Sequence, residues 1–126
     1  MPFNLPLAAG AVFGLTGVVM GALGAHALAG QLSASGVDIW DTAVLYHLTH
    51  AVVLVALGMR LRDEAPSRWP FVVAGWGFGV GILLFSGSLY VLALGGPRFF
   101  GPLTPLGGVA LCAGWIALLA AARRPG

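Results

Sequence analysis

Two histidines lie three residues apart in a segment that is apolar enough to cross a membrane. His47 and His50 fall between Trp40 and Leu61, where most other side chains are aliphatic. Ionisable side chains are costly in hydrocarbon, so those found there serve a structural or a functional role. Imidazoles at this spacing share one face of a helix, where they suit hydrogen bonding, proton transfer, metal coordination or contact with a bound ligand.

Other hydrogen-bonding side chains are expected at a similar depth on neighbouring segments. Counted along straight helices, they fall in the half of the membrane away from the chain termini. We therefore predict a polar cluster whose candidate members are His26, Tyr46, His47, His50, Ser86, Ser88 and Tyr90. Three interpretations stay open: hydrogen bonds that fix helix register, a bound lipid headgroup, quinone or haem, and a path for protons or a metal ion.

Catalytic patterns are missing from the sequence. It contains no Ser–His–Asp order, no phosphate-binding loop and no paired carboxylates near the histidines. The single Cys112 excludes an intrachain disulfide and a cysteine metal site. We predict that the protein is not an enzyme, has no catalytic residues and has no resident metal or other cofactor, haem or quinone being the alternative.

Composition places these residues in a membrane protein. Hydrophobic residues make up 59% of the 126 residues and charged residues 8%, against about 25% charged in a typical soluble domain. A soluble domain of this size cannot bury so much apolar surface. The chain has no lysine, and its arginines are not clustered as a nucleic-acid-binding face requires.

Four apolar segments are each long enough to cross about 30 Å of hydrocarbon. Turn residues or charges separate them. The sequence thus predicts an all-α integral membrane protein, one four-helix transmembrane domain over residues 1–126. The predicted spans are Leu5–Ala29, Trp40–Leu61, Phe71–Leu94 and Leu103–Ala122.

The distribution of arginine predicts the orientation. Five arginines lie on the side that holds both termini, and only Arg98 lies on the other. Loops rich in arginine stay inside, so both termini are expected in the cytoplasm. Ala25-His26-Ala27 resembles a signal-peptidase site, but the preceding segment lacks a positive start and is too long, so we expect Met1–Ala27 to be retained.

Three helix starts are expected from capping residues. Asn4 with Pro6 predicts the first start, and Asp38 with Asp41 resembles a capping box for the second span. A cap explains these two carboxylates better than a catalytic or ion-binding role. Thr104 followed by proline predicts the start of the fourth span.

Small residues recur at helical spacing and predict how the helices meet. Association in lipid depends on close packing and interhelical hydrogen bonds. The third span carries two interleaved glycine pairs, Gly75 with Gly79 and Gly77 with Gly81, one on each side. The predicted packing residues of the first and fourth spans are Gly10, Gly14, Gly17, Gly21, Gly24, Gly107 and Gly114.

Four motifs, one in each span, resemble those of a known family. They are Gly21–Leu28, Tyr46–Ala51, Phe85–Tyr90 and Thr104–Gly108. In this order they resemble the domain of unknown function 423 family, which includes small bacterial inner-membrane proteins of the YgdD and YwdK type and the eukaryotic transmembrane protein 256. The resemblance covers essentially the whole chain.

The resemblance implies a small multi-pass membrane protein without an established activity, so no catalytic residue carries over. Two features depart from the family pattern: His47 stands where glutamine is frequent, and the connection from Gly30 to Val37 is poorer in charge. A metal site that needs His47 would not extend to such relatives. The residues on the family's motif positions are His26, His50, Ser86, Ser88, Tyr90 and Thr104.

The leading functional hypothesis is a non-enzymatic accessory or scaffold subunit of a larger membrane complex. The small-residue stripes outnumber the groups that could catalyse a reaction. The expected partners are the lipid bilayer and other membrane-protein subunits or a second copy, and not nucleic acid. The alternative is lipid, quinone or haem binding at the polar cluster, and a transporter is third because no continuous polar route is evident.

Overall fold

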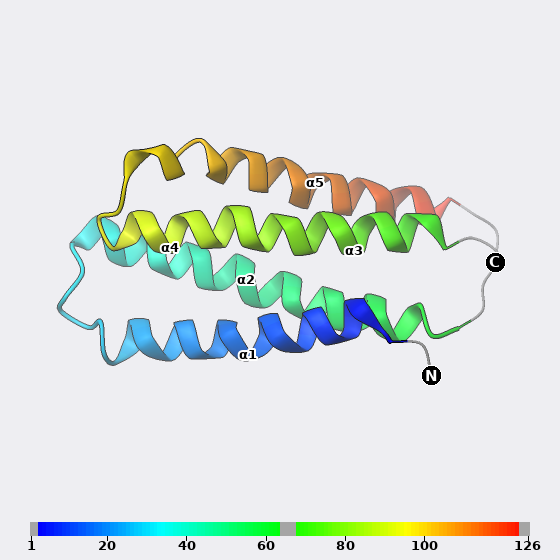
Figure 1. The fold of residues 1–126 in the computed structure, drawn as a ribbon, viewed down its shortest axis with the longest axis horizontal. Helices are drawn as coiled ribbons and strands as arrows, with labels where there is room; N and C mark the ends of the chain where they lie inside the picture. Colours follow the sequence, from blue (N-terminus) through cyan, green and yellow to red (C-terminus); the bar gives the residue numbers. More distant parts are fainter. Residues whose placement is uncertain (1–2, 64–67, 124–126) are drawn as a thin grey trace.

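The computed structural model describes residues 3–63 and 68–123. Within these ranges it contains four helical spans, each long and apolar enough to cross a membrane, arranged as an antiparallel bundle (Figure 1). Both described ends of the chain lie at the same end of the bundle. The elements are α1 (Leu5–Ala25), α2 (Ala34–Arg60), α3 (Trp69–Gly81), the π-helix η1 (Ile82–Ser86), α4 (Gly87–Ala93), the 3₁₀ turn η2 (Arg98–Phe100) and α5 (Leu103–Ala122).

The third span is one continuous rod of three elements, α3, η1 and α4. The predicted all-α class with four membrane-spanning helices is confirmed. Gly95, with φ 81°, follows the rod and reverses the chain toward η2 and α5. A positive φ of this size suits glycine at the end of a helix.

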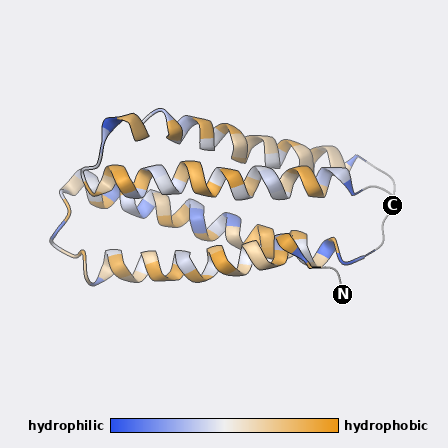
Figure 2. Ribbon diagram, in the orientation of Figure 1, coloured by the Kyte–Doolittle hydropathy of each residue, from blue (hydrophilic) through white to orange (hydrophobic). Residues whose placement is uncertain are grey.

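Helix α2 occupies the centre of the bundle. Helix α1 packs chiefly against α2, whereas α3 and η1 pack against α5, and α2 contacts every part of the third span. Figure 2 shows that the hydrophilic colours within the spans concentrate on α2. The central helix therefore carries the polar side chains that the surrounding apolar helices shield from lipid.

Two of the three predicted helix starts are wrong. The Asn4 side chain does accept from Leu7 N, at 3.1 Å, and caps α1. Helix α2, however, begins six residues before Trp40, because Ser33 is its cap and accepts from Gly36 N at 3.0 Å. Asp38 therefore lies inside the helix.

Asp41 also lies inside α2 and so takes no part in a capping box. Thr104 does not cap α5 either, because that helix already begins at Leu103. The Thr104 hydroxyl instead contacts Ser88 on the neighbouring span.

The glycines of α1 differ in how closely they meet α2. A Cβ on Gly10 would lie 2.7 Å from Val55 N, and one on Gly17 would lie 2.6 Å from the Leu48 side chain. One on Gly24 would lie 2.6 Å from the Trp40 ring, and one on Gly21 would make only ordinary contact at 3.5 Å.

Gly14 lies outside this seam, since a Cβ there would have nothing within 4 Å. The contact between α1 and α2 thus depends on Gly10, Gly17 and Gly24, seven residues apart.

The third span and α5 meet just as closely. A Cβ on Gly107 would collide with the backbone of Phe85, inside η1, and one on Gly114 would lie 2.6 Å from the Phe78 ring. From the other side, a Cβ on Gly77 would lie 2.8 Å from Ala110 O. The second glycine pair of this span, Gly75 and Gly79, has nothing within 4 Å.

Two apolar clusters make up the core. One surrounds Leu54 and Phe78, and the other surrounds Trp40 and Ala43. Along α2 the two histidines lie between these clusters. His47 is thirteen residues from either end of the helix, Ala34 or Arg60, so the earlier start of α2 moves the polar residues toward the middle of the helix.

Candidate functional site

His47 links three helices through its two ring nitrogens. Its Nδ1 lies 2.8 Å from the hydroxyl of Tyr90 on α4, and its Nε2 lies 3.0 Å from the hydroxyl of Thr16 on α1. The Thr16 hydroxyl also lies 3.0 Å from Val12 O, which can only accept. One arrangement satisfies every group: Tyr90 donates to Nδ1, Nε2–H donates to Thr16, and Thr16 donates to its own helix.

His50 links α2 to α5 in the same way. Its Nδ1 lies 2.7 Å from Tyr46 O, a carbonyl that can only accept. The Trp115 indole N–H, which can only donate, reaches Nε2 at 3.1 Å. These two partners together require a neutral imidazole with its proton on Nδ1.

Aromatic rings enclose both imidazoles. The Tyr46 ring stacks on His50 with an interplanar angle of 11°, and Phe78 and Trp115 cover the His50 ring from other sides. His47 meets the edge of Phe13 at 5.9 Å between centroids. Only 5% of His47 and 4% of His50 is exposed, so neither imidazole presents an open surface to a ligand.

The two serines tie the third span to its neighbours on opposite sides. The Ser86 hydroxyl, in η1, donates to Ala43 O on α2 at 2.8 Å. The Ser88 hydroxyl lies 2.6 Å from the Thr104 hydroxyl on α5, and also 2.9 Å from Phe85 O. Both serines are buried, and each replaces contact with hydrocarbon by a hydrogen bond to protein.

Six of the seven candidate residues make contacts between helices, in separate groups that we together call the polar network, and His26 does not. His26 is exposed at the C-terminal end of α1, where its backbone N–H closes the last turn on Ala22 O. Tyr46 is at the margin, with 39% of its surface exposed. Its ring joins the group through His50 and Phe85.

Three members of the network, Thr16, Thr104 and Trp115, were not among the seven candidate residues. Thr16 directly precedes Gly17, where an added Cβ would lie 3.3 Å from the His47 ring. Trp115 directly follows Gly114, which lies against Phe78. For Thr16 and Trp115, the feature of the sequence that could have identified them is the adjacent packing glycine. A residue next to such a glycine lies close to the helix interface.

The buried polar atoms of this network have hydrogen-bond partners within the chain. Among residues 3–63 and 68–123, no buried side-chain nitrogen or oxygen lacks a partner. In the same part of the chain, no three His, Cys, Asp or Glu side chains are grouped as a metal site. The arrangement can orient helices, but each imidazole nitrogen would have to give up a protein partner before it could bind anything else.

Comparisons with known proteins agree with the motif resemblance. The family model described as "Protein of unknown function (DUF423)" matches residues 20–108. "UPF0382 membrane protein YwdK" of Bacillus subtilis is 41% identical over 113 residues, 90% of this chain and 91% of that protein. "UPF0382 inner membrane protein YgdD" of Escherichia coli is 35% identical over 114 residues, 90% and 86% of the respective chains. A search of solved structures finds no match.

Proposed function

The chain belongs to the DUF423 family of membrane proteins, and on that premise we propose that it is a non-enzymatic accessory or scaffold subunit of a larger membrane complex. It is a multi-pass protein of the bacterial inner membrane. The family description and the names of these relatives indicate no enzymatic activity.

The observation that carries the proposal is the closed polar network. A catalytic or ligand-binding group needs a donor or acceptor that faces a substrate. Both ring nitrogens of His47 and both of His50 instead face groups of this chain. This supports a structural role for the histidines, with the outer faces of the helices left for interactions.

Haem or quinone binding at the cluster is the competing hypothesis, and the same hydrogen bonds disfavour it. Ligation of haem iron by His50 through Nε2 would leave the Trp115 indole N–H without its acceptor. Ligation by His47 would break its bond to Thr16 or to Tyr90. The absorption spectrum of the protein purified from its native membrane, with organic extraction, is expected to show neither group.

Helix α1 is the best candidate for the docking surface. It packs chiefly on α2 and exposes a row of large aliphatic side chains, Leu15 and Val18 among them. Glycine in a helix costs about 1 kcal/mol relative to alanine, and at Gly14 no contact within this chain offsets that cost. Close approach of a partner helix at Gly14 would offset it.

Purification from native membranes in mild detergent tests this proposal. We expect a specific membrane protein to co-purify with the wild type. Gly14→Leu should reduce the recovery of that protein severalfold, because the leucine side chain would fill the space that a partner helix needs at Gly14. The matched control, Ala22→Leu, adds a similar side chain at another exposed position of α1 and should retain the partner. A wild type that elutes alone, or equal recovery with Gly14→Leu, would contradict the proposal.

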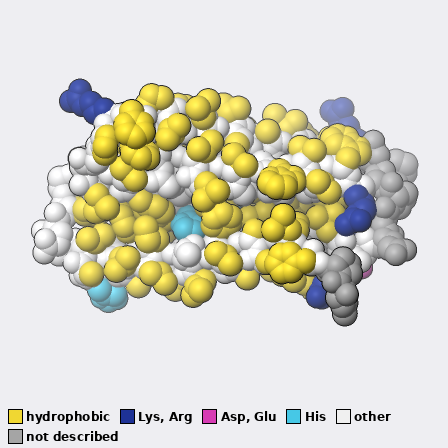
Figure 3. Space-filling view, in the orientation of Figure 1, with side chains coloured by type: hydrophobic (Ala, Val, Ile, Leu, Met, Phe, Trp, Pro, Cys, Tyr) yellow, Lys and Arg dark blue, Asp and Glu magenta, His cyan; other side chains and the backbone are white. Residues whose placement is uncertain are grey.

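We also propose that both termini face the cytoplasm. The end of the bundle that holds them carries Arg60, Arg62 and Arg68, whereas Arg98 lies at the opposite end. Figure 3 shows these charges at the two ends and apolar side chains over the face between them. The positive-inside rule places the richer end in the cytoplasm.

Cysteine labelling tests the orientation. In a Cys112→Ala background, Phe99→Cys should react with an impermeant maleimide in intact cells. Asp63→Cys should react only in inverted vesicles, since Phe99 and Asp63 are exposed at opposite ends of the bundle. The reverse pattern would overturn the assignment.

A further inference from the structure

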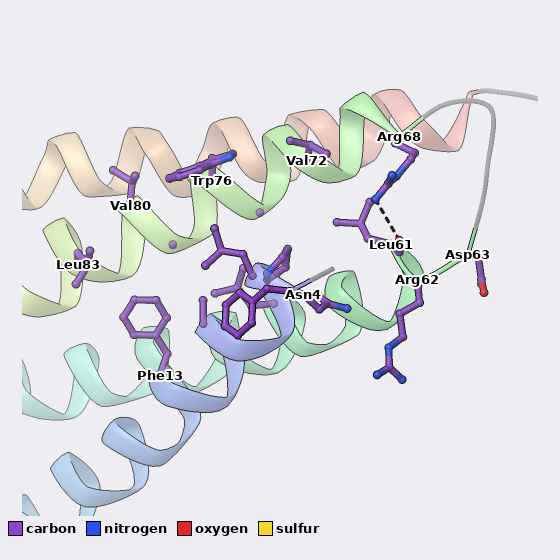
Figure 4. Close-up of a pocket in the computed structure, with 17 residues that line it drawn as sticks. Asn4, Phe13, Leu61, Arg62, Asp63, Arg68, Val72, Trp76, Val80 and Leu83 are labelled. Carbon is purple, nitrogen blue, oxygen red and sulfur yellow. Dashed lines mark hydrogen bonds between the residues drawn. The ribbon is translucent and has the colours of Figure 1, made fainter. Parts of the chain in front are cut away.

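An apolar groove opens between α1 and the third span, at the end of the bundle that holds the chain termini (Figure 4). Phe13 of α1 forms one wall, Trp76 and Leu83 of the third span form the other, and Leu54 of α2 contributes to the floor. Its volume of about 860 Å³ falls within the ~300–1,000 Å³ that ligand pockets occupy. The groove is separate from the polar network, whose bonded nitrogens face the inside of the bundle.

The groove exists because α1 and α3 pack on different partners. Helix α1 lies chiefly on α2, while α3 lies chiefly on α5. On the side of α3 that faces the groove, Gly75 and Gly79 have no side chain, and a Cβ on either would contact nothing within 4 Å. The chain therefore leaves space where a pair of leucines would fill it.

Polar and charged groups stand at one end of this apolar space. Arg62 lies beside Asn4 on the α1 side, and Arg68 lies on the α3 side (Figure 4). Arg68 donates one hydrogen bond to Leu61 O, at 3.2 Å, and retains further N–H donors. The Asp63 carboxylate and the Arg62 side chain both point away from the apolar walls in Figure 4, so the guanidinium group that faces the mouth is that of Arg68.

The length of the groove can be compared with that of an acyl chain. From Val72 near its mouth to Leu83 at its far end, eleven residues of helix rise about 17 Å. That is close to half of the ~30 Å hydrocarbon core. A lipid acyl chain also crosses one leaflet, so the groove matches an acyl chain in length.

We propose that this groove binds an anionic phospholipid, with one acyl chain against Trp76 and Leu83 and the phosphate at Arg68. Guanidinium groups bind phosphate oxygens through charge-assisted, often paired, hydrogen bonds. Basic residues at the membrane edge select anionic over neutral headgroups. The lipid is bound in the leaflet on the side of the termini, which is the cytoplasmic leaflet in the orientation proposed above.

Native mass spectrometry of the delipidated full-length protein tests the proposal. Three probes are compared: phosphatidylglycerol, phosphatidylcholine with identical acyl chains, and glycerol phosphate without chains. We expect phosphatidylglycerol to bind about fivefold more tightly than phosphatidylcholine, since the Arg68 guanidinium favours the anionic headgroup. Glycerol phosphate should not be retained, because it lacks the chain that fills the groove.

Two kinds of variant separate the headgroup from the chain. Arg68→Gln should bring phosphatidylglycerol down to the affinity of phosphatidylcholine. Gly79→Leu should weaken both lipids about tenfold or more by filling the groove. The matched controls, Arg98→Gln and Gly87→Leu, change an arginine at the opposite end and an unobstructed glycine outside the groove, and should bind as the wild type does.

Several results would overturn the proposal. The first is equal affinity of the wild type for phosphatidylglycerol and phosphatidylcholine, and the second is unchanged lipid binding in both groove variants. The third is retention of glycerol phosphate without an acyl chain, and the fourth is a dimer that forms without lipid and that Gly79→Leu dissociates. Should Gly79→Leu fail to fold, Arg68→Gln still decides, because the Arg68 side chain is exposed and outside the core.

Discussion

Gly107→Ala is expected to destabilise the protein by about 3 kcal/mol, near the upper end of what overpacking costs. The added methyl group would collide with the backbone of Phe85, which cannot move aside as a flexible side chain can. Because Phe85 lies within η1, the collision would separate α5 from the π-helix and strain the bond between Ser88 and Thr104. Unfolding in mixed micelles, followed by far-ultraviolet circular dichroism, measures the loss.

The neighbouring Gly108→Ala is the matched control. It makes the same chemical change in the same helix, but its methyl group would lie 3.9 Å from the Phe85 ring. We expect it to be neutral or to stabilise by up to about 1 kcal/mol through helix propensity. Equal effects of the two substitutions would show that the close approach at Gly107 does not contribute to stability.

His50→Ala is expected to cost about 3–4 kcal/mol. The substitution leaves a cavity beneath Phe78 and Trp115, and large-to-small changes at buried sites cost about 2–5 kcal/mol. It also leaves the Trp115 N–H without its acceptor. Most of the loss should come from packing, since hydrogen bonds between membrane helices average about 0.6 kcal/mol.

The same unfolding assay checks this prediction, with Thr49→Ala as the control. Thr49 precedes His50, is exposed, and bonds only to Leu45 O of its own helix, at 2.6 Å. It should change stability by less than about 0.5 kcal/mol, as surface substitutions usually do. If His50→Ala were as harmless as Thr49→Ala, the histidine would not be structural, and a ligand-binding role would become the better explanation.

Much of the fold could be predicted because composition and segment length specify membrane helices strongly. The start of α2 was the main error, and its cause is physical. The predicted connection from Gly30 to Val37 includes Gly36, yet Gly36 lies within the helix, where a Cβ would approach Ala93 O to 3.0 Å. A glycine required by close packing and one required by a turn look alike in a sequence.

The types of residue in the polar network could also be predicted, but their pairing could not. Which side chains meet depends on which helices are neighbours and how each is rotated. His50 finds its partner on α5, and His47 finds one partner on α1 and one on α4. His26 was grouped with them by depth alone, and it lies on the exposed end of α1.

The π-helix η1 divides the third span into two parts that are rotated relative to each other about the helix axis. One additional residue in a helical turn rotates everything after it by about 100°. Residues before η1 face α5 through Gly77 and Gly81, and Tyr90 after it faces α2. The neighbouring helices, and not the thickness of the bilayer, therefore fix the number of residues in the third span. A span shortened by one residue would still match the membrane, but the residues before and after η1 could not both face their present partners.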